Sequence, residues 1–87
     1  MKHTHQVTRY DGSHKQLATE IGDLFYNSLA VLLQHMADKM AKDAAADRGR
    51  GRVRLATELD ASAADLASAA SHIRQAWTIC APHVEKA

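Results

Sequence analysis

The sequence predicts an all-α protein, built as a long antiparallel helical hairpin that follows a short irregular N-terminal arm and dimerises into a four-helix bundle. Apolar residues recur at steps of three and four over two long stretches, as they do on one face of a helix. Gly49 and Gly51 separate the two stretches and favour a turn between them. The apolar faces are wider than one neighbouring helix can cover, which favours a bundle of more than two helices.

The N-terminal arm is predicted over residues 1–12, where apolar residues show no helical period. The Asp11-Gly12-Ser13 segment then favours a turn followed by a helix start. Ser13 and Gln16 have the spacing of a capping box, in which each side chain satisfies a backbone N–H at the beginning of a helix. We therefore expect a first helix over residues 13–47.

The first helix carries an apolar series that is extended in its middle by further leucines and a valine. The series is Ala18, Ile21, Phe25, Leu29, Leu32, Met36, Met40 and Ala44. Gly22 interrupts it, although glycine inside a helix costs about 1 kcal/mol relative to alanine. We expect Gly22 to mark a close approach of two helices, with close approach of a ligand as the alternative.

A turn over residues 48–52 and a second helix over residues 53–81 complete the predicted hairpin. The second helix repeats its apolar residues in heptad-like steps and is rich in alanine, which lets two helix axes approach closely. Pro82 is expected to end it, leaving a tail over residues 82–87. Asp60 and Ser62 are good N-cap residues, so an additional break there is the alternative.

The 87 residues form a single domain whose core is small, because a chain of this size buries only about 60–65% of its unfolded surface. A homodimer is the economical way to cover two wide apolar faces, and two-fold dimers are the commonest assembly. The expected interface consists of Ile21, Phe25, Leu32, Met36, Leu59, Leu66, Ile73 and Trp77.

Composition points to a cytoplasmic protein with no membrane partner. Cys80 is the single cysteine, so an internal disulfide and a cysteine-based zinc cluster are excluded, and a reducing compartment is favoured. No apolar run reaches the roughly 18–20 residues that cross a bilayer, and the N-terminus lacks the hydrophobic core of a secretory signal.

Four arginines in the turn form the clearest candidate for nucleic-acid binding. They are Arg48, Arg50, Arg52 and Arg54, and without them the formal net charge of +1 would be −3. Guanidinium groups on a glycine-containing segment can bind phosphates. The alternative is that the arginines offset the helix dipole and pair with Asp43, Asp47 and Glu58.

The segment EIGDLFYNSLAVLL contains Glu20 and Asp23 and resembles the E-x-x-D helix of the all-α nucleotide pyrophosphohydrolases of the MazG type and of phosphoribosyl-ATP pyrophosphatase. The resemblance implies that these two acids bind Mg²⁺ against substrate phosphates. The same families carry an E-E-x-x-E helix upstream, whereas Asp11 is the only acid before Glu20 here. A divergent pyrophosphohydrolase-like protein that lacks half of the metal site is therefore a weaker alternative function.

None of the six histidines lies in a motif that would define a metal geometry. His3 could bind Cu²⁺ or Ni²⁺ together with a free amine at Met1, in the square-planar nitrogen set that these ions favour. No nucleophile and base can be paired from the sequence, and we expect no cofactor. The predicted function is a non-enzymatic homo-oligomeric interaction or regulatory module whose protein partner the sequence does not identify.

Overall fold

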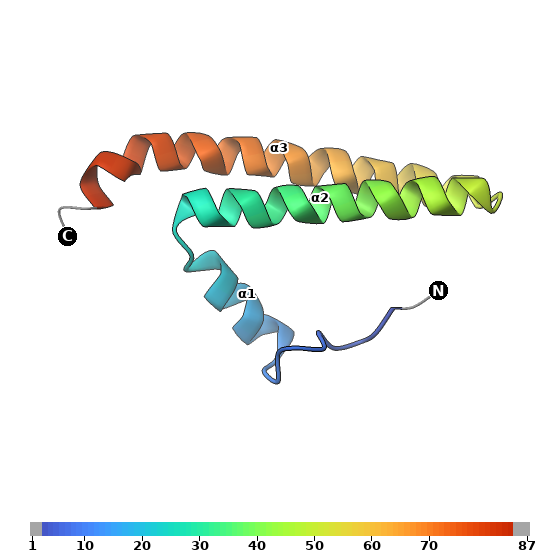
Figure 1. Ribbon diagram of the computed structural model, residues 1–87, viewed down its shortest axis with the longest axis horizontal. Coiled ribbons are helices and arrows are strands. Elements are labelled where there is room, and N and C mark those ends of the chain that lie inside the picture. The colour runs from blue at the N-terminus through green and yellow to red at the C-terminus, as the bar shows by residue number, and fades with distance from the viewer. Residues whose placement is uncertain (1–2, 85–87) are drawn as a thin grey trace.

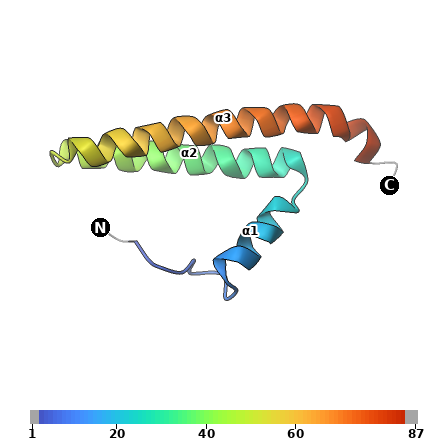
Figure 2. The same cartoon turned by 180° about the vertical axis from the view of Figure 1, so that it is seen from behind.

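The chain folds into three helices, seen in a computed structural model that describes residues 3–84 (Figure 1). They are α1 (His14–Gly22), α2 (Tyr26–Gly49) and α3 (Val53–Val84). The part described contains no strand, so the all-helical prediction is confirmed. Helices α2 and α3 pack side by side along most of their length, consistent with the predicted hairpin, whereas α1 points away from them (Figures 1 and 2).

The predicted capping box is present at the start of α1. The backbone N–H of Gln16 donates to the Ser13 side chain at 3.1 Å, and the backbone N–H of Ser13 donates to the Gln16 side chain at 2.8 Å. Two N–H groups that have no partner within the helix are satisfied in this way. The local sequence alone therefore positions the beginning of this helix.

The single helix predicted over residues 13–47 is wrong, because the chain bends between α1 and α2 at the link 23–25. The N–H of Asp23 donates to the carbonyl of Thr19, and the N–H of Leu24 donates to the carbonyl of Ile21 in a tighter turn. Phe25 then has extended backbone angles, with φ −53° and ψ 143°, and its carbonyl accepts the first hydrogen bond of α2 from Leu29. The apolar period continues through this bend although the helix does not.

The prediction that Gly22 marks close helix packing is also wrong. A Cβ atom built at this position would meet no heavy atom within 4 Å among those outside its own turn. Gly22 is instead the last residue of α1. Its low helix propensity favours the bend that follows it.

The turn between the long helices is built as predicted around a glycine. Gly51 has a φ of 80°, which a residue with a side chain rarely adopts. The carbonyl of Asp47 accepts hydrogen bonds from the N–H groups of Arg50 and Arg52. Helix α2 extends two residues further than predicted and ends at Gly49.

Helix α3 is continuous from Val53 to Val84, so the alternative break at Asp60 or Ser62 does not occur. It also passes through Pro82, which corrects the predicted end at residue 81. A proline this close to the end of a helix removes one hydrogen bond, and few residues beyond it need the ladder. Of the predicted tail, residues 85–87 lie outside the described residues.

Buried alanines spaced seven or fourteen residues apart line the contact between the two long helices. The buried apolar residues are Ala30, Ala37 and Ala44 on α2, and Ala56 and Ala70 on α3. We call these five residues the alanine seam. Seven-residue spacing keeps one row of each helix against its neighbour, and small side chains let the axes approach closely. None of the described helices combines the length and the apolar character needed to cross a membrane.

Replacing Ala37 by leucine is expected to lower the free energy of unfolding by about 1–3 kcal/mol, because the larger side chain would force the closely packed helices apart. Ala37 is 4% exposed. Ala46→Leu is the matched control, because Ala46 is exposed on the same helix. Urea unfolding followed by circular dichroism at equal protein concentrations measures both, and equal stability of the two variants would contradict the close packing.

Candidate interaction surface

A row of bulky apolar side chains runs along α2 beside the alanine seam. Phe25, Leu29, Leu32 and Met36 follow one another at steps of four, three and four, which keeps them on one side of the helix. Phe25 is 64% exposed and Met36 is 45% exposed, whereas the two leucines are half-buried. This row is therefore in partial contact with solvent although it is the bulkiest part of the helix.

A second row of large apolar side chains lies on α3, formed by Leu59, Leu66 and Ile73 at seven-residue spacing. All three are half-buried. Relative to the alanine seam, the rows on α2 and α3 are rotated about their helix axes in the same sense. In an antiparallel pair this rotation places them on the same side of the hairpin. We call the two rows together the apolar face.

The apolar face continues to the open end of the hairpin, where an aromatic residue at the start of α2 meets one near the end of α3. The rings of Phe25 and Trp77 have centroids 6.0 Å apart and planes tilted by 45°. Aromatic pairs favour separations and tilts in this range. Ile79 is 75% exposed nearby in sequence, so apolar area remains uncovered at this end.

The structure thus places six of the eight predicted interface residues on the paired helices and a seventh, Phe25, at the N-cap of α2. Ile21 is the exception, because it belongs to α1 and the bend separates it from the others. Two of the eight, Phe25 and Met36, are exposed, and the remaining six are half-buried. Their assignment to an interface stays a prediction, because the single chain shows their exposure and not what covers them.

The chain exposes more surface than a globular protein of its size. A compact protein of 9.5 kDa has an accessible surface of about 5,000 Å², whereas this chain exposes 6888 Å². Its radius of gyration is 15.6 Å, compared with about 12 Å for a compact domain of 87 residues. The excess is on the order of 1,800 Å², and one partner contributes about 800 Å² to a standard interface.

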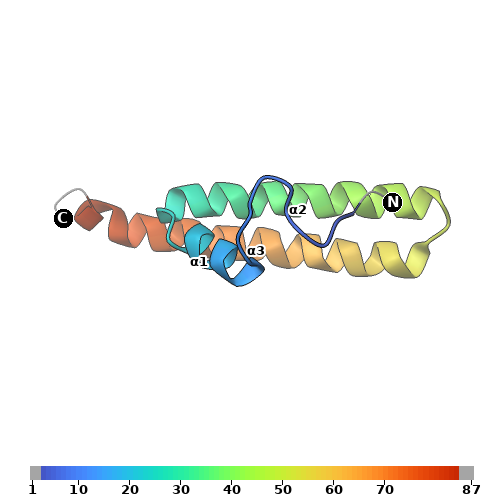
Figure 3. The same ribbon diagram turned by 90° about the horizontal axis from the view of Figure 1, so that it is seen from below.

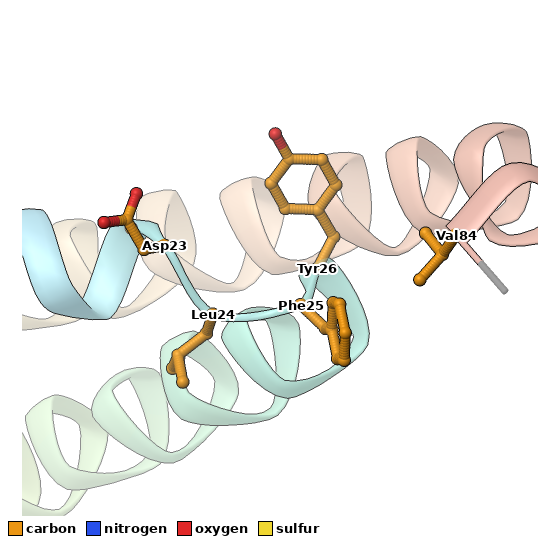
Figure 4. Close-up of a pocket in the computed structure, with 6 residues that line it drawn as sticks. Asp23, Leu24, Phe25, Tyr26 and Val84 are labelled. Carbon is orange, nitrogen blue, oxygen red and sulfur yellow. The ribbon is translucent and has the colours of Figure 1, made fainter. Parts of the chain in front are cut away.

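The link 23–25 forms one side of an open pocket of about 260 Å³ (Figure 4). Leu24, Phe25 and Tyr26 line it from the link and the start of α2, and Val84 lines it from the end of α3. In the close-up, Leu24 and Phe25 point to one side, whereas Asp23 and Tyr26 point to the other (Figure 4). The walls combine polar and apolar groups, because Asp23 lies beside Leu24, Phe25 and Val84.

Aspartates bind three of the four arginines at the hairpin tip, residues 47–54. Arg52 Nη1 lies 3.2 Å from Asp47 Oδ1, and Arg50 Nη1 lies 3.9 Å from the same oxygen. Arg48 Nη2 lies 2.6 Å from Asp60 Oδ2. The side chain of Asp47 is only 6% exposed, so these cations compensate a buried charge. Nucleic-acid binding by the four arginines stays a prediction, and the ion pairs at the tip compete with it.

Of the acids that the sequence analysis named as arginine partners, the structure pairs one with arginines and another with a lysine. Asp47 does bind arginines, whereas Asp43 binds Lys39 at 2.6 Å four residues earlier on α2. The hydrogen bond from Lys39 lowers the pKa of the Asp43 carboxyl, and the nearby charges of Lys39 and His3 lower it further.

The candidate metal ligands are not brought together. Glu20 accepts a hydrogen bond from the Tyr10 hydroxyl, and Asp23 is the C-cap of α1, outside the helix that holds Glu20. Among residues 3–84, no group of three histidine, cysteine, aspartate or glutamate side chains could hold a metal ion. The possible Cu²⁺ or Ni²⁺ site at His3 includes Met1, which lies outside the described residues.

The sequence analysis named Asp47 among three possible partners of the arginines but did not identify it as a buried acid that binds two of them. Its position was visible in principle, because Ala30, Ala37 and Ala44 repeat at intervals of seven and Asp47 follows three residues later, at the next inward position. A charged residue at such a position requires a partner. The next turn supplies it through Arg52.

Comparison with known proteins does not extend these observations. The chain matches no protein-family model, and neither the curated proteins nor the solved structures searched include a significant match to it. The functional argument therefore rests on the chain's own geometry.

Arg52→Gln is expected to lower the free energy of unfolding by about 1–2 kcal/mol, because it removes the charged donor closest to the buried carboxylate of Asp47. Arg48→Gln is the matched control in the same segment. Arg48 and Asp60 are each about half exposed, and exposed ion pairs contribute about 0–1 kcal/mol. Denaturant titration at fixed protein concentration compares them, and a loss for Arg48→Gln as large as that for Arg52→Gln would contradict this role of Asp47.

Proposed function

We propose that the protein is a non-enzymatic interaction module that works as a homodimer, in which the apolar faces of two hairpins pack together into a four-helix bundle. The observation that carries this proposal is the apolar face, which is only partly buried and lies beside a seam that contains only alanines. Each alanine buries a single methyl group, so the contact between α2 and α3 leaves the larger apolar side chains without a full set of neighbours.

Two further observations support a second copy as the partner. The excess surface of the chain, on the order of 1,800 Å², exceeds what one partner contributes to a standard interface and is typical of obligate dimers. The apolar face also lies on one side of the hairpin, so a two-fold axis through its centre would bring like surfaces together. Such an interface would contain coiled-coil-like rows of Leu and Met side chains.

The proposed role of the dimer is to present a rigid helical surface to another protein, in the cytoplasm as the composition suggests. Val31, Val53 and Leu55 remain exposed on the long helices, with 55%, 57% and 39% of their surfaces accessible. Exposed apolar residues of this size are candidate contacts for such a protein. The proposal requires no catalytic group or cofactor.

The wild-type chain is expected to sediment as a dimer at micromolar concentration, and Met36→Glu is expected to weaken dimerisation by at least about tenfold. A charge at this position would be buried in the interface of both copies without a partner. Because Met36 is 45% exposed in the single chain, its replacement should leave the hairpin folded. Sedimentation velocity measures the dimer, and circular dichroism checks the helix content.

Val31→Glu is the matched control. Val31 is 55% exposed and lies five positions before Met36, which is about 140° around the helix. It therefore leaves the apolar face unchanged and should leave the dimer intact. A wild-type chain that stays monomeric and folded at high concentration would overturn the proposal, as would equal weakening by both variants.

A further inference from the structure

Helix α1 does not pack along either of the long helices. The extensive packing between elements in residues 3–84 is that of α2 with α3, and α1 contains no buried residue. It has nine residues, whereas isolated helices shorter than about 12–15 residues are only marginally stable in water. The capping box stabilises its first turn but does not supply a surface to pack on.

The apolar residues of α1 and the link form a row that suits such a surface. Leu17, Ile21 and Leu24 follow one another at steps of four and three. Leu24 is 38% exposed, and the other two are half-buried. The opposite side of the helix carries Lys15 and Thr19, which are exposed. The helix is thus amphipathic, with an apolar row and no neighbour along its length.

The arm and α1 are held together as one unit that projects from the hairpin. The Tyr10 hydroxyl donates a hydrogen bond to Glu20, and the capping box joins Ser13 to Gln16. Seen from below, this unit lies in front of the paired helices (Figure 3). In the same view the N-terminal arm crosses over α2 (Figure 3).

We infer that α1 of each chain docks on the apolar face of a second copy, so that the two copies exchange their α1 helices. This inference rests on the proposed homodimer and adds the element that closes it. The bend at the link 23–25 directs α1 away from its own hairpin (Figure 1), which leaves the apolar row of α1 free to contact a partner. The open pocket of about 260 Å³ at the link would lie beside that contact.

Two-fold symmetry makes the exchanged arrangement economical. Each docked α1 would cover part of the face that the two hairpins leave open, and the same contact would occur twice in the dimer. The apolar rows of α1 and α2 would then both be buried. The link 23–25 is already bent in the single chain, so it would not need to rearrange to reach the partner. Dimerisation would therefore cost little conformational entropy in the link.

Ile21→Glu tests whether α1 takes part in the dimer. It is expected to raise the dimer dissociation constant by at least about tenfold, whereas the control Thr19→Glu, on the opposite side of the same helix, should change it by less than about threefold. Sedimentation velocity provides both values. If Ile21→Glu leaves the constant unchanged while Met36→Glu raises it, the exchange of α1 is overturned and the homodimer stands. If the wild-type chain is monomeric, the homodimer itself fails.

Crosslinking then distinguishes docking on the partner from docking on the same chain. A chain with Leu17→benzoylphenylalanine is mixed with a large excess of isotope-labelled wild-type chain, irradiated and analysed by mass spectrometry. We expect crosslinks to labelled peptides from residues 26–84, and few crosslinks from the control Lys15→benzoylphenylalanine. Crosslinks confined to unlabelled peptides of the same chain would overturn the exchange.

Discussion

The close contact of two alanine rows is the constraint on which the rest of this structure depends. Ala37 and Ala70 are buried where α2 and α3 pack together, whereas every larger apolar side chain that the structure describes on these helices is half-buried or exposed. A buried methyl group contributes only about 0.8 kcal/mol, which makes an alanine contact a weak source of stability for two helices of this length. The chain thus combines a well-defined hairpin geometry with apolar surface that the hairpin cannot bury.

The hairpin tip depends on the same geometry. Asp47 lies three residues after Ala44, at the next inward position of α2, and its side chain is buried there. Arginines of the following turn compensate its charge. The glycine at position 51 permits the backbone angle that brings Arg52 back to Asp47. Two arginines are therefore explained by the packing of the helices, with no ligand required.

Much of this fold could be predicted from local signals, and the errors have a common physical origin. The capping box at Ser13 and the turn at Gly51 each depend on a few adjacent residues, and both are observed. The bend after Gly22 was missed because Ile21, Phe25 and Leu29 keep the apolar period across it, and one glycine is a weak signal against such a pattern. The prediction that Pro82 ends the helix was wrong, because the free-energy cost of a proline in a helix depends on how many helical residues follow it.

The residues of the candidate surface could be predicted from the sequence. Which of them face the other helix of the hairpin and which face outward could not. Periodicity identifies Phe25, Leu32 and Met36 as one row, since spacing alone determines which residues share a side of a helix. Each long helix carries a row of alanines and a row of larger apolar residues. Only one of these two rows can face the other helix of the hairpin. The alanines do so here, because small side chains permit the closer approach. That choice is a property of the helix pair, which single-helix patterns do not contain.

The bend between α1 and α2 changes what the continuing apolar period means. In a straight helix, Ile21 would extend the row of Phe25, Leu29 and Leu32, and a dimer would be a simple pairing of flat faces. The bend removes Ile21 from that row, because Ile21 belongs to α1, which points away from the hairpin (Figure 1). A period that survives across a bend is expected if both segments pack on one continuous surface, and in the proposed dimer the second copy supplies that surface. The same residues would then contribute to affinity and, through the bend, to the geometry of pairing.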